Sequence, residues 1–102
     1  PKWLANTEIL SIWDDHDYGK NDAGGTYVYK QKAESLYLDF WNIPIEDERH
    51  KRDGIYFSKT KLINGNKILF IGLDTRYFRS DIIKSRGIYQ QNTNADATMG
   101  AC

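Results

Sequence analysis

The residues with the clearest chemical potential form a short polar run, WDDHDYGKND, directly after an apolar segment. It places three carboxylates and an imidazole at consecutive positions, and an amide follows in the same loop: Asp14, Asp15, His16, Asp17 and Asn21. Carboxylate and amide oxygens are hard ligands that suit Ca²⁺, Mg²⁺, Mn²⁺ or Fe³⁺. Because adjacent carboxylates repel one another, we expect a positive partner nearby, and a multivalent cation is the simplest one.

A plainer interpretation of the same run is a solvated loop. Asp and Asn favour turns because their side chains hydrogen-bond to nearby backbone groups. The run lacks the spaced acids, central Gly and closing Glu of an EF-hand, and the chain has neither a zincin helix motif nor a P-loop. Composition alone therefore favours the loop over a metal site.

A second polar group follows another apolar run, ILFIGLDTRYFR, which ends in Asp74, Arg76 and Arg79. Ligands in open α/β sheets bind at the carboxyl ends of the strands. Two apolar runs that both end in charge therefore predict one polar rim, with Asp14 and Asp74 at the same edge of a sheet. Arg76 is suited to bidentate binding of a phosphate or carboxylate. Equally, a pair of Asp74 with Arg76 or Arg79 can simply fix the end of the strand.

Hydrophobic patterning predicts the elements that carry these groups. The run at 8–13 is short and apolar, and the run at 68–73 is almost continuously apolar, so both indicate buried strands of one sheet. Between them, 27–42 has the period of an amphipathic helix that ends near Asn42 and Pro44. The dipeptide Asn64–Gly65 favours a hairpin turn. Residues 45–53 are nearly all charged and indicate an exposed loop, and we expect a frayed tail at 90–102.

Length and composition limit the possible functions. A chain of 102 residues is long enough for one domain, and 14 basic residues balance 14 acidic ones, so no nucleic-acid signal arises. A single cysteine, Cys102, excludes an internal disulfide. No apolar run approaches the roughly 20 residues of a membrane-spanning helix.

Taken together, four blocks resemble the alkaline phosphatase D (PhoD-like) metallophosphatases. These are IWDDHDYGKND, the helix ending FWNIP, then GIYFSKTK and LFIGLDTRYFR. Their order and spacing match the middle of that family's catalytic domain over about residues 9–79. The first and last blocks are specific, and they outweigh the solvated-loop interpretation.

The resemblance implies a dinuclear metal phosphoesterase on an α/β sandwich of the metallophosphatase type. It implies that Asp14, Asp15 and Asn21 bind divalent or trivalent ions (Ca, Fe, Mn or Mg). It also implies a catalytic His16 and an Arg76 that offsets charge on the phosphate of an ester substrate. Asp17 and Asp74 would support these groups, with Asp17 orienting the ring of His16. Members of the family are secreted, periplasmic or membrane-associated.

The family's pattern also includes metal-ligand motifs upstream and downstream that this sequence lacks. We therefore expect residues 1–102 to be a partial metallophosphatase domain, incomplete at both ends, and the isolated chain to have little or no activity. The alternative is a non-catalytic, truncated remnant that acts as a cation-binding or interaction module. The flanking coding sequence would separate the two.

Overall fold

The structure, a computed structural model, describes residues 2–84 and 98–100. The described residues form three α-helices, one 3₁₀-helix and four strands. In chain order these are α1 (Lys2–Ala5), α2 (Asp15–Tyr18), α3 (Lys30–Phe40), η1 (Glu48–His50), β1 (Phe57–Ile63), β2 (Asn66–Gly72), β3 (Ile82–Lys84) and β4 (Thr98–Gly100).

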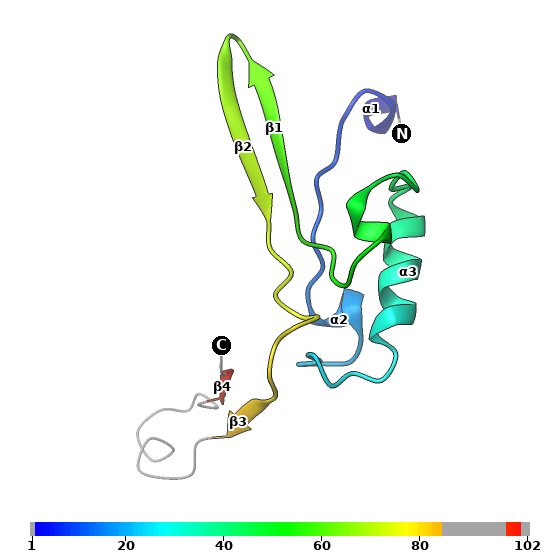
Figure 1. The fold of residues 1–102 in the computed structure, drawn as a ribbon, viewed down its shortest axis with the longest axis vertical. Helices are drawn as coiled ribbons and strands as arrows, with labels where there is room; N and C mark the ends of the chain where they lie inside the picture. The colour runs from blue at the N-terminus through cyan, green and yellow to red at the C-terminus, as the bar shows by residue number, and fades with distance from the viewer. Residues whose placement is uncertain (1, 85–97, 101–102) are drawn as a thin grey trace.

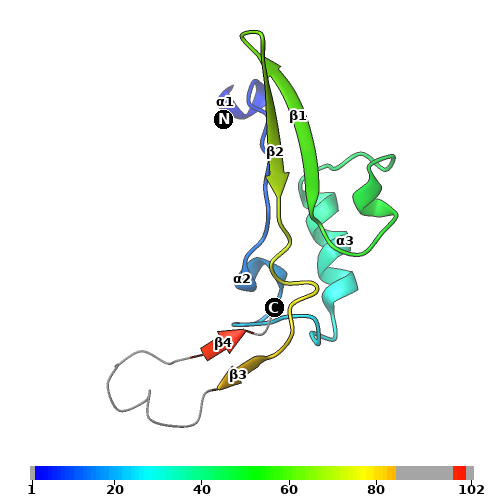
Figure 2. The same ribbon diagram turned by 60° about the vertical axis from the view of Figure 1, so that its left-hand side comes forward.

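The fold mixes α and β structure, as predicted, in an extended arrangement. β1 and β2 form an antiparallel hairpin that projects away from the body formed by α2, α3 and η1 (Figures 1 and 2). The radius of gyration is 17.5 Å, whereas a compact chain of this length has one of about 13 Å. The fold therefore leaves much of its apolar surface uncovered. None of the helices in the described part of the chain is both long and apolar enough to cross a membrane.

The hairpin is confirmed at the predicted turn. Asn64 and Gly65 both have positive φ, 50° and 79°, which is the geometry of the tight turns that suit the twist of paired strands. The register places Ile63 opposite Asn66 and Phe57 opposite Gly72.

The expectation that the second strand is buried on both faces was wrong. Every residue of β2 is exposed except Gly72, which is half-buried. Because β1 is its one partner and the two form a two-stranded sheet, no second layer covers the apolar side chains of β2 within the described residues.

The helix is confirmed but shorter than predicted, covering Lys30–Phe40. Its end is fixed by a Schellman-type motif, in which the N–H of Ile43 donates to the carbonyl of Leu38 and the N–H of Asn42 donates to that of Asp39, at 2.9 and 3.0 Å. Asn42 takes the required left-handed conformation, with φ of 50°.

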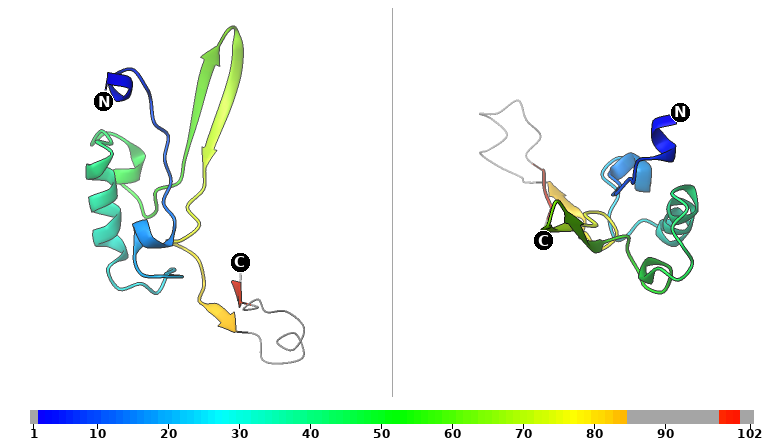
Figure 3. Two further views of the ribbon diagram at one scale, coloured as in Figure 1. Left: turned by 180° about the vertical axis from the view of Figure 1, so that it is seen from behind. Right: turned by 90° about the horizontal axis from the view of Figure 1, so that it is seen from above.

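The strand predicted at 8–13 was also wrong. These residues have no assigned strand or helix, and the segment runs from α1 to α2 along the hairpin (Figures 1 and 3). Ion pairs between Glu8 and two lysines of β1, Lys59 and Lys61, hold it there. An apolar run becomes a strand only when its backbone finds a partner, and here side chains make the contact instead.

The exposed character of the 45–53 loop is largely confirmed, although η1 interrupts it and Asp47 accepts the N–H of Arg49 at 2.9 Å. Most of the tail predicted to fray lies outside the described residues. Its described part, β4, pairs antiparallel with β3.

The core is a small cluster at the base of the hairpin, where three aromatic residues dominate. Its buried members are Trp13, Tyr18, Ala23, Leu38, Ile55 and Tyr77. Rings meet edge-on, with centroids of Trp13 and Tyr18 4.9 Å apart and those of Trp13 and Tyr37 5.1 Å apart. This is the arrangement that aromatic quadrupoles favour. The core thus joins α2, α3 and the loops that flank the hairpin.

One acidic side chain, Glu34 on α3, is buried beside this core, with 7% of its surface exposed. Burial raises its pKa to about 7, and the charges of Asp53 and Asp74 act in the same direction. The backbone N–H of Gly54 and the charge of Arg52 partly oppose the shift. A carboxyl that resists ionisation in the fold, but not in the unfolded chain, makes stability depend on pH.

We predict that Glu34→Gln removes this dependence. Below the unfolded pKa of about 4.5 both states hold the proton, so wild type and variant behave alike. Between pH 4.5 and pH 7 the unfolded state binds fewer protons than the native state, so wild type loses stability over this interval and the loss is complete above pH 7. The variant should therefore be more stable above pH 7, by roughly 2–3 kcal/mol.

Urea denaturation between pH 4 and pH 8 measures the difference, with the exposed Glu46→Gln as the matched control. A constant difference between wild type and Glu34→Gln across this range would contradict the assignment.

Candidate functional site

The two polar runs meet around the carboxylate of Asp74. Its Oδ1 accepts hydrogen bonds from the indole Nε1 of Trp13 at 2.9 Å and from the backbone N–H groups of Arg76 and Tyr77 at 3.0 and 2.9 Å. Its Oδ2 accepts the N–H of Ile55 at 2.9 Å. Trp13 and Asp74 are 61 positions apart in the chain, so this carboxylate connects three segments that the sequence keeps separate.

In the structure, the acidic run is paired with a positively charged side chain, that of Arg76. Its Nε donates to Oδ1 of Asp14 at 3.0 Å, and its terminal nitrogen Nη2 pairs with the same oxygen. The guanidinium is mostly buried, with 14% of the side chain exposed, whereas 75% of the Asp14 side chain is exposed. Asp14 and Asp74 therefore lie on the same side of the molecule, as predicted, although the sheet expected to bring them there is absent from the described residues.

Asp15 is held by backbone groups. Its Oδ1 accepts the N–H of His16 at 2.9 Å, and its Oδ2 accepts the N–H of Asp22 at 3.2 Å. The Asp22 bond is the largest of the causes that lower the pKa of Asp15, so this carboxyl is ionised at neutral pH. The left-handed conformation of Asp22, with φ of 58°, turns the loop back toward α2.

The imidazole of His16 is open to solvent, with 74% of the side chain exposed. Its Nδ1 lies 3.5 Å from Oδ1 of Asp15, so the carboxylate beside the ring belongs to Asp15. Asp17 turns its own carboxylate to the backbone N–H of Asp14, at 3.2 Å. The amide nitrogen of Asn21 donates to Oδ2 of Asp22 at 3.0 Å.

The side chains of Asp14 and Asp15 can supply part of the oxygen ligands that a hard-cation site needs. Arg76 occupies one oxygen of Asp14, which leaves Oδ2 able to bind a cation, and each oxygen of Asp15 retains a lone pair beside its one N–H bond. Within residues 2–84 and 98–100, no three or more His, Cys, Asp or Glu side chains are grouped to hold a metal ion.

Sequence reasoning missed the indole of Trp13 and the backbone of Asp22 as parts of the site. The position of Trp13, directly before the acidic run, was a usable signal, because a buried indole N–H requires an acceptor. No sequence signal identifies Asp22 as a donor, because every non-proline residue carries a backbone N–H and loop geometry decides where it points.

Comparison of the chain with family models, curated proteins and solved structures finds no match.

We predict that Asp74→Asn destabilises the protein. If the side-chain oxygen of the asparagine keeps the three hydrogen bonds made at Oδ1, its NH₂ group replaces Oδ2 and faces the N–H of Ile55. Two donors then face each other, and the N–H of Ile55, a residue with 0% exposure, has no acceptor. A buried donor without an acceptor costs about 1–3 kcal/mol. Chemical denaturation measures this loss, and Asp39→Asn on the exposed surface of α3 is the matched control. Equal stability of both variants would show that Asp74 does not organise the junction.

Proposed function

We propose that this junction is part of the active site of a metal-dependent phosphoesterase of the PhoD-like metallophosphatase type, carried on part of a metallophosphatase-type sandwich. Asp14 and Asp15, with Asn21, would supply metal ligands, and His16 and Arg76 would act on a phosphate ester. The observation that carries the proposal is the bond between Arg76 and Asp14, because it brings the two motif-bearing segments to one place.

The charges at the junction suit an anionic substrate and a cation together. Asp14 and Asp15 offer oxygen ligands, while Arg76 presents a planar, permanently charged donor beside them. Its Nη1 is buried and has no hydrogen-bond partner within the described part of the chain. A phosphate oxygen would therefore meet this nitrogen only after the Arg76 side chain turns toward the surface.

His16 is placed to exchange a proton with substrate. Its ring is exposed, and the carboxylate of Asp15 lies 3.5 Å from Nδ1, so the ring is within reach of the leaving oxygen of a bound ester. Bound metal ions in such sites activate water and stabilise the charge of the phosphoryl group.

A second candidate is a non-catalytic module that holds one hard cation or only mediates contacts. It is favoured by the pairing of Arg76 with Asp14, which gives the guanidinium a partner within the protein without any phosphate. Only the first candidate requires Arg76 and His16 to contact a phosphate group, so phosphate binding distinguishes the two.

We expect the 102-residue chain to bind Mn²⁺ or Ca²⁺ weakly through Asp14 and Asp15. A metal that binds only the native state raises the melting temperature in a concentration-dependent way. The double variant Asp14→Asn, Asp15→Asn should lose this shift, while Asp39→Asn should retain it. Thermal unfolding and titration calorimetry provide the measurements. Metal binding that survives the double substitution would place the cation elsewhere.

Phosphate binding tests the phosphoesterase proposal directly. In the presence of Mn²⁺, inorganic phosphate should bind the wild-type chain and bind Arg76→Gln at least tenfold more weakly, whereas Lys67→Gln on the exposed hairpin should be unaffected. Hydrolysis of phosphomonoesters and phosphodiesters by this chain should be minimal, because two-metal chemistry needs more ligands than these residues bring together. Substantial turnover abolished by His16→Ala would refute that expectation, and equal phosphate binding by Arg76→Gln would refute the proposed role of Arg76.

A further inference from the structure

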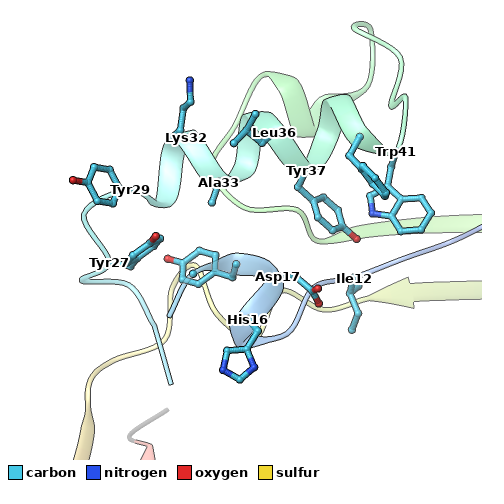
Figure 4. A pocket seen from close by; sticks show the side chains of 13 residues that line it. Ile12, His16, Asp17, Tyr27, Tyr29, Lys32, Ala33, Leu36, Tyr37 and Trp41 are labelled. Carbon is cyan, nitrogen blue, oxygen red and sulfur yellow. The ribbon is translucent and has the colours of Figure 1, made fainter. Parts of the chain in front are cut away.

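A groove of about 470 Å³ lies between α3 and the segment that contains α2 (Figure 4). Six of the 13 residues that line it carry large aromatic rings: Tyr18, Tyr27, Tyr29, Tyr37, Phe40 and Trp41. The volume lies within the range of small-molecule sites, which are usually apolar with a few polar groups. From the sequence, these aromatic residues are predicted to lie only on a helix face and in a loop.

Several of these rings remain available after the core has formed. Tyr29 and Phe40 are 65% and 75% exposed. Ring pairs fix their orientations, with centroids 5.9 Å apart for Tyr27 and Tyr29 and 5.2 Å apart for Phe40 and Trp41, both in edge-to-face geometry. Neighbouring rings thus hold these side chains in place while leaving ring surface uncovered, which suits a flat ring better than a flexible chain.

The groove is continuous with the polar junction through α2. Asp17 lines the groove, and its carboxylate also accepts the backbone N–H of Asp14. His16 lies on the same side of the groove, with its ring turned outward (Figure 4). Lys32 stands at the opposite, outer edge on α3. The Asp17 carboxylate keeps its negative charge when it accepts this hydrogen bond, so the cation nearest to hand for a bound anion is Arg76, which is paired with Asp14.

We propose that this groove binds the aromatic ring of an aryl phosphate ester whose phosphate lies at the Asp14–Arg76 junction. The inference rests on the proposed function for the position of the phosphate, but the ring site depends only on the aromatic walls. It narrows the substrate class from phosphate esters in general to esters of aromatic alcohols.

The ring site is tested with phenol, which carries no phosphate and needs neither metal nor Arg76. In ¹⁵N–¹H NMR titrations, phenol should shift signals of Tyr37 and Trp41. Phe40→Ala should weaken its binding about threefold to tenfold, whereas Tyr29→Ala, about 16 Å away at the other end of α3, should have little effect. Trp3→Ala removes a comparably exposed ring, 62% exposed on α1, and should leave binding unchanged. Absence of shifts in the groove, or equal loss in all three variants, would overturn the ring site.

The ester is tested with phenyl phosphate and methyl phosphate in the presence of Mn²⁺. Phenyl phosphate should bind at least tenfold more tightly than either phenol or methyl phosphate, and Arg76→Gln should reduce its affinity to that of phenol. If phenol binds but phenyl phosphate binds no better, the link to the phosphate site is refuted while the ring site stands.

A second copy of the chain is the competing occupant. Sedimentation measured across a range of protein concentrations should show that Phe40→Ala leaves the association state unchanged. Self-association that this substitution abolishes would identify the groove as a dimer contact and overturn the proposal.

Discussion

The junction depends on the hydrogen bonds that the carboxylate of Asp74 accepts. Asp74 follows an exposed hairpin strand, yet its carboxylate accepts N–H groups from the indole of Trp13, the loop at Ile55 and its own turn. Charge-assisted bonds of this kind are stronger than neutral ones. Because these donors come from segments far apart in the chain, the carboxylate fixes where the acidic run lies relative to Arg76.

The junction also explains how adjacent carboxylates are tolerated in a small fold. Asp14 is paired with a guanidinium, Asp15 accepts two backbone N–H groups, and Asp17 accepts a third. Each carboxylate thus has its own hydrogen-bond donor within the protein. The run therefore does not depend on a single positive partner, and a cation bound there would share Asp14 with Arg76.

Apolar side chains are exposed to solvent on two parts of this fold, the hairpin and α3. On the hairpin, Leu62, Leu69 and Ile71 face solvent, and on α3 Leu36 and Phe40 do so beside the aromatic groove. Exposed apolar patches on a small domain usually mark contact or binding surfaces. The groove differs from the hairpin because its rings hold one another in place and adjoin polar groups, whereas the hairpin presents unpaired strand edges.

Local chemistry in the sequence determined the helix, its end at Asn42, the turn at Asn64–Gly65 and the identity of the polar residues. These follow from interactions within a few positions of the chain, such as left-handed backbone preferences and hydrophobic period. The sequence misled us at 8–13 and in β2, because apolar runs indicate buried strands only if partners cover them. Tertiary structure alone decided that Trp13 and Arg76 join the two runs, since contacts across more than 60 positions depend on how the intervening elements pack. The same packing formed the aromatic groove, whose residues are ordinary helix and loop residues until α2 and α3 lie side by side.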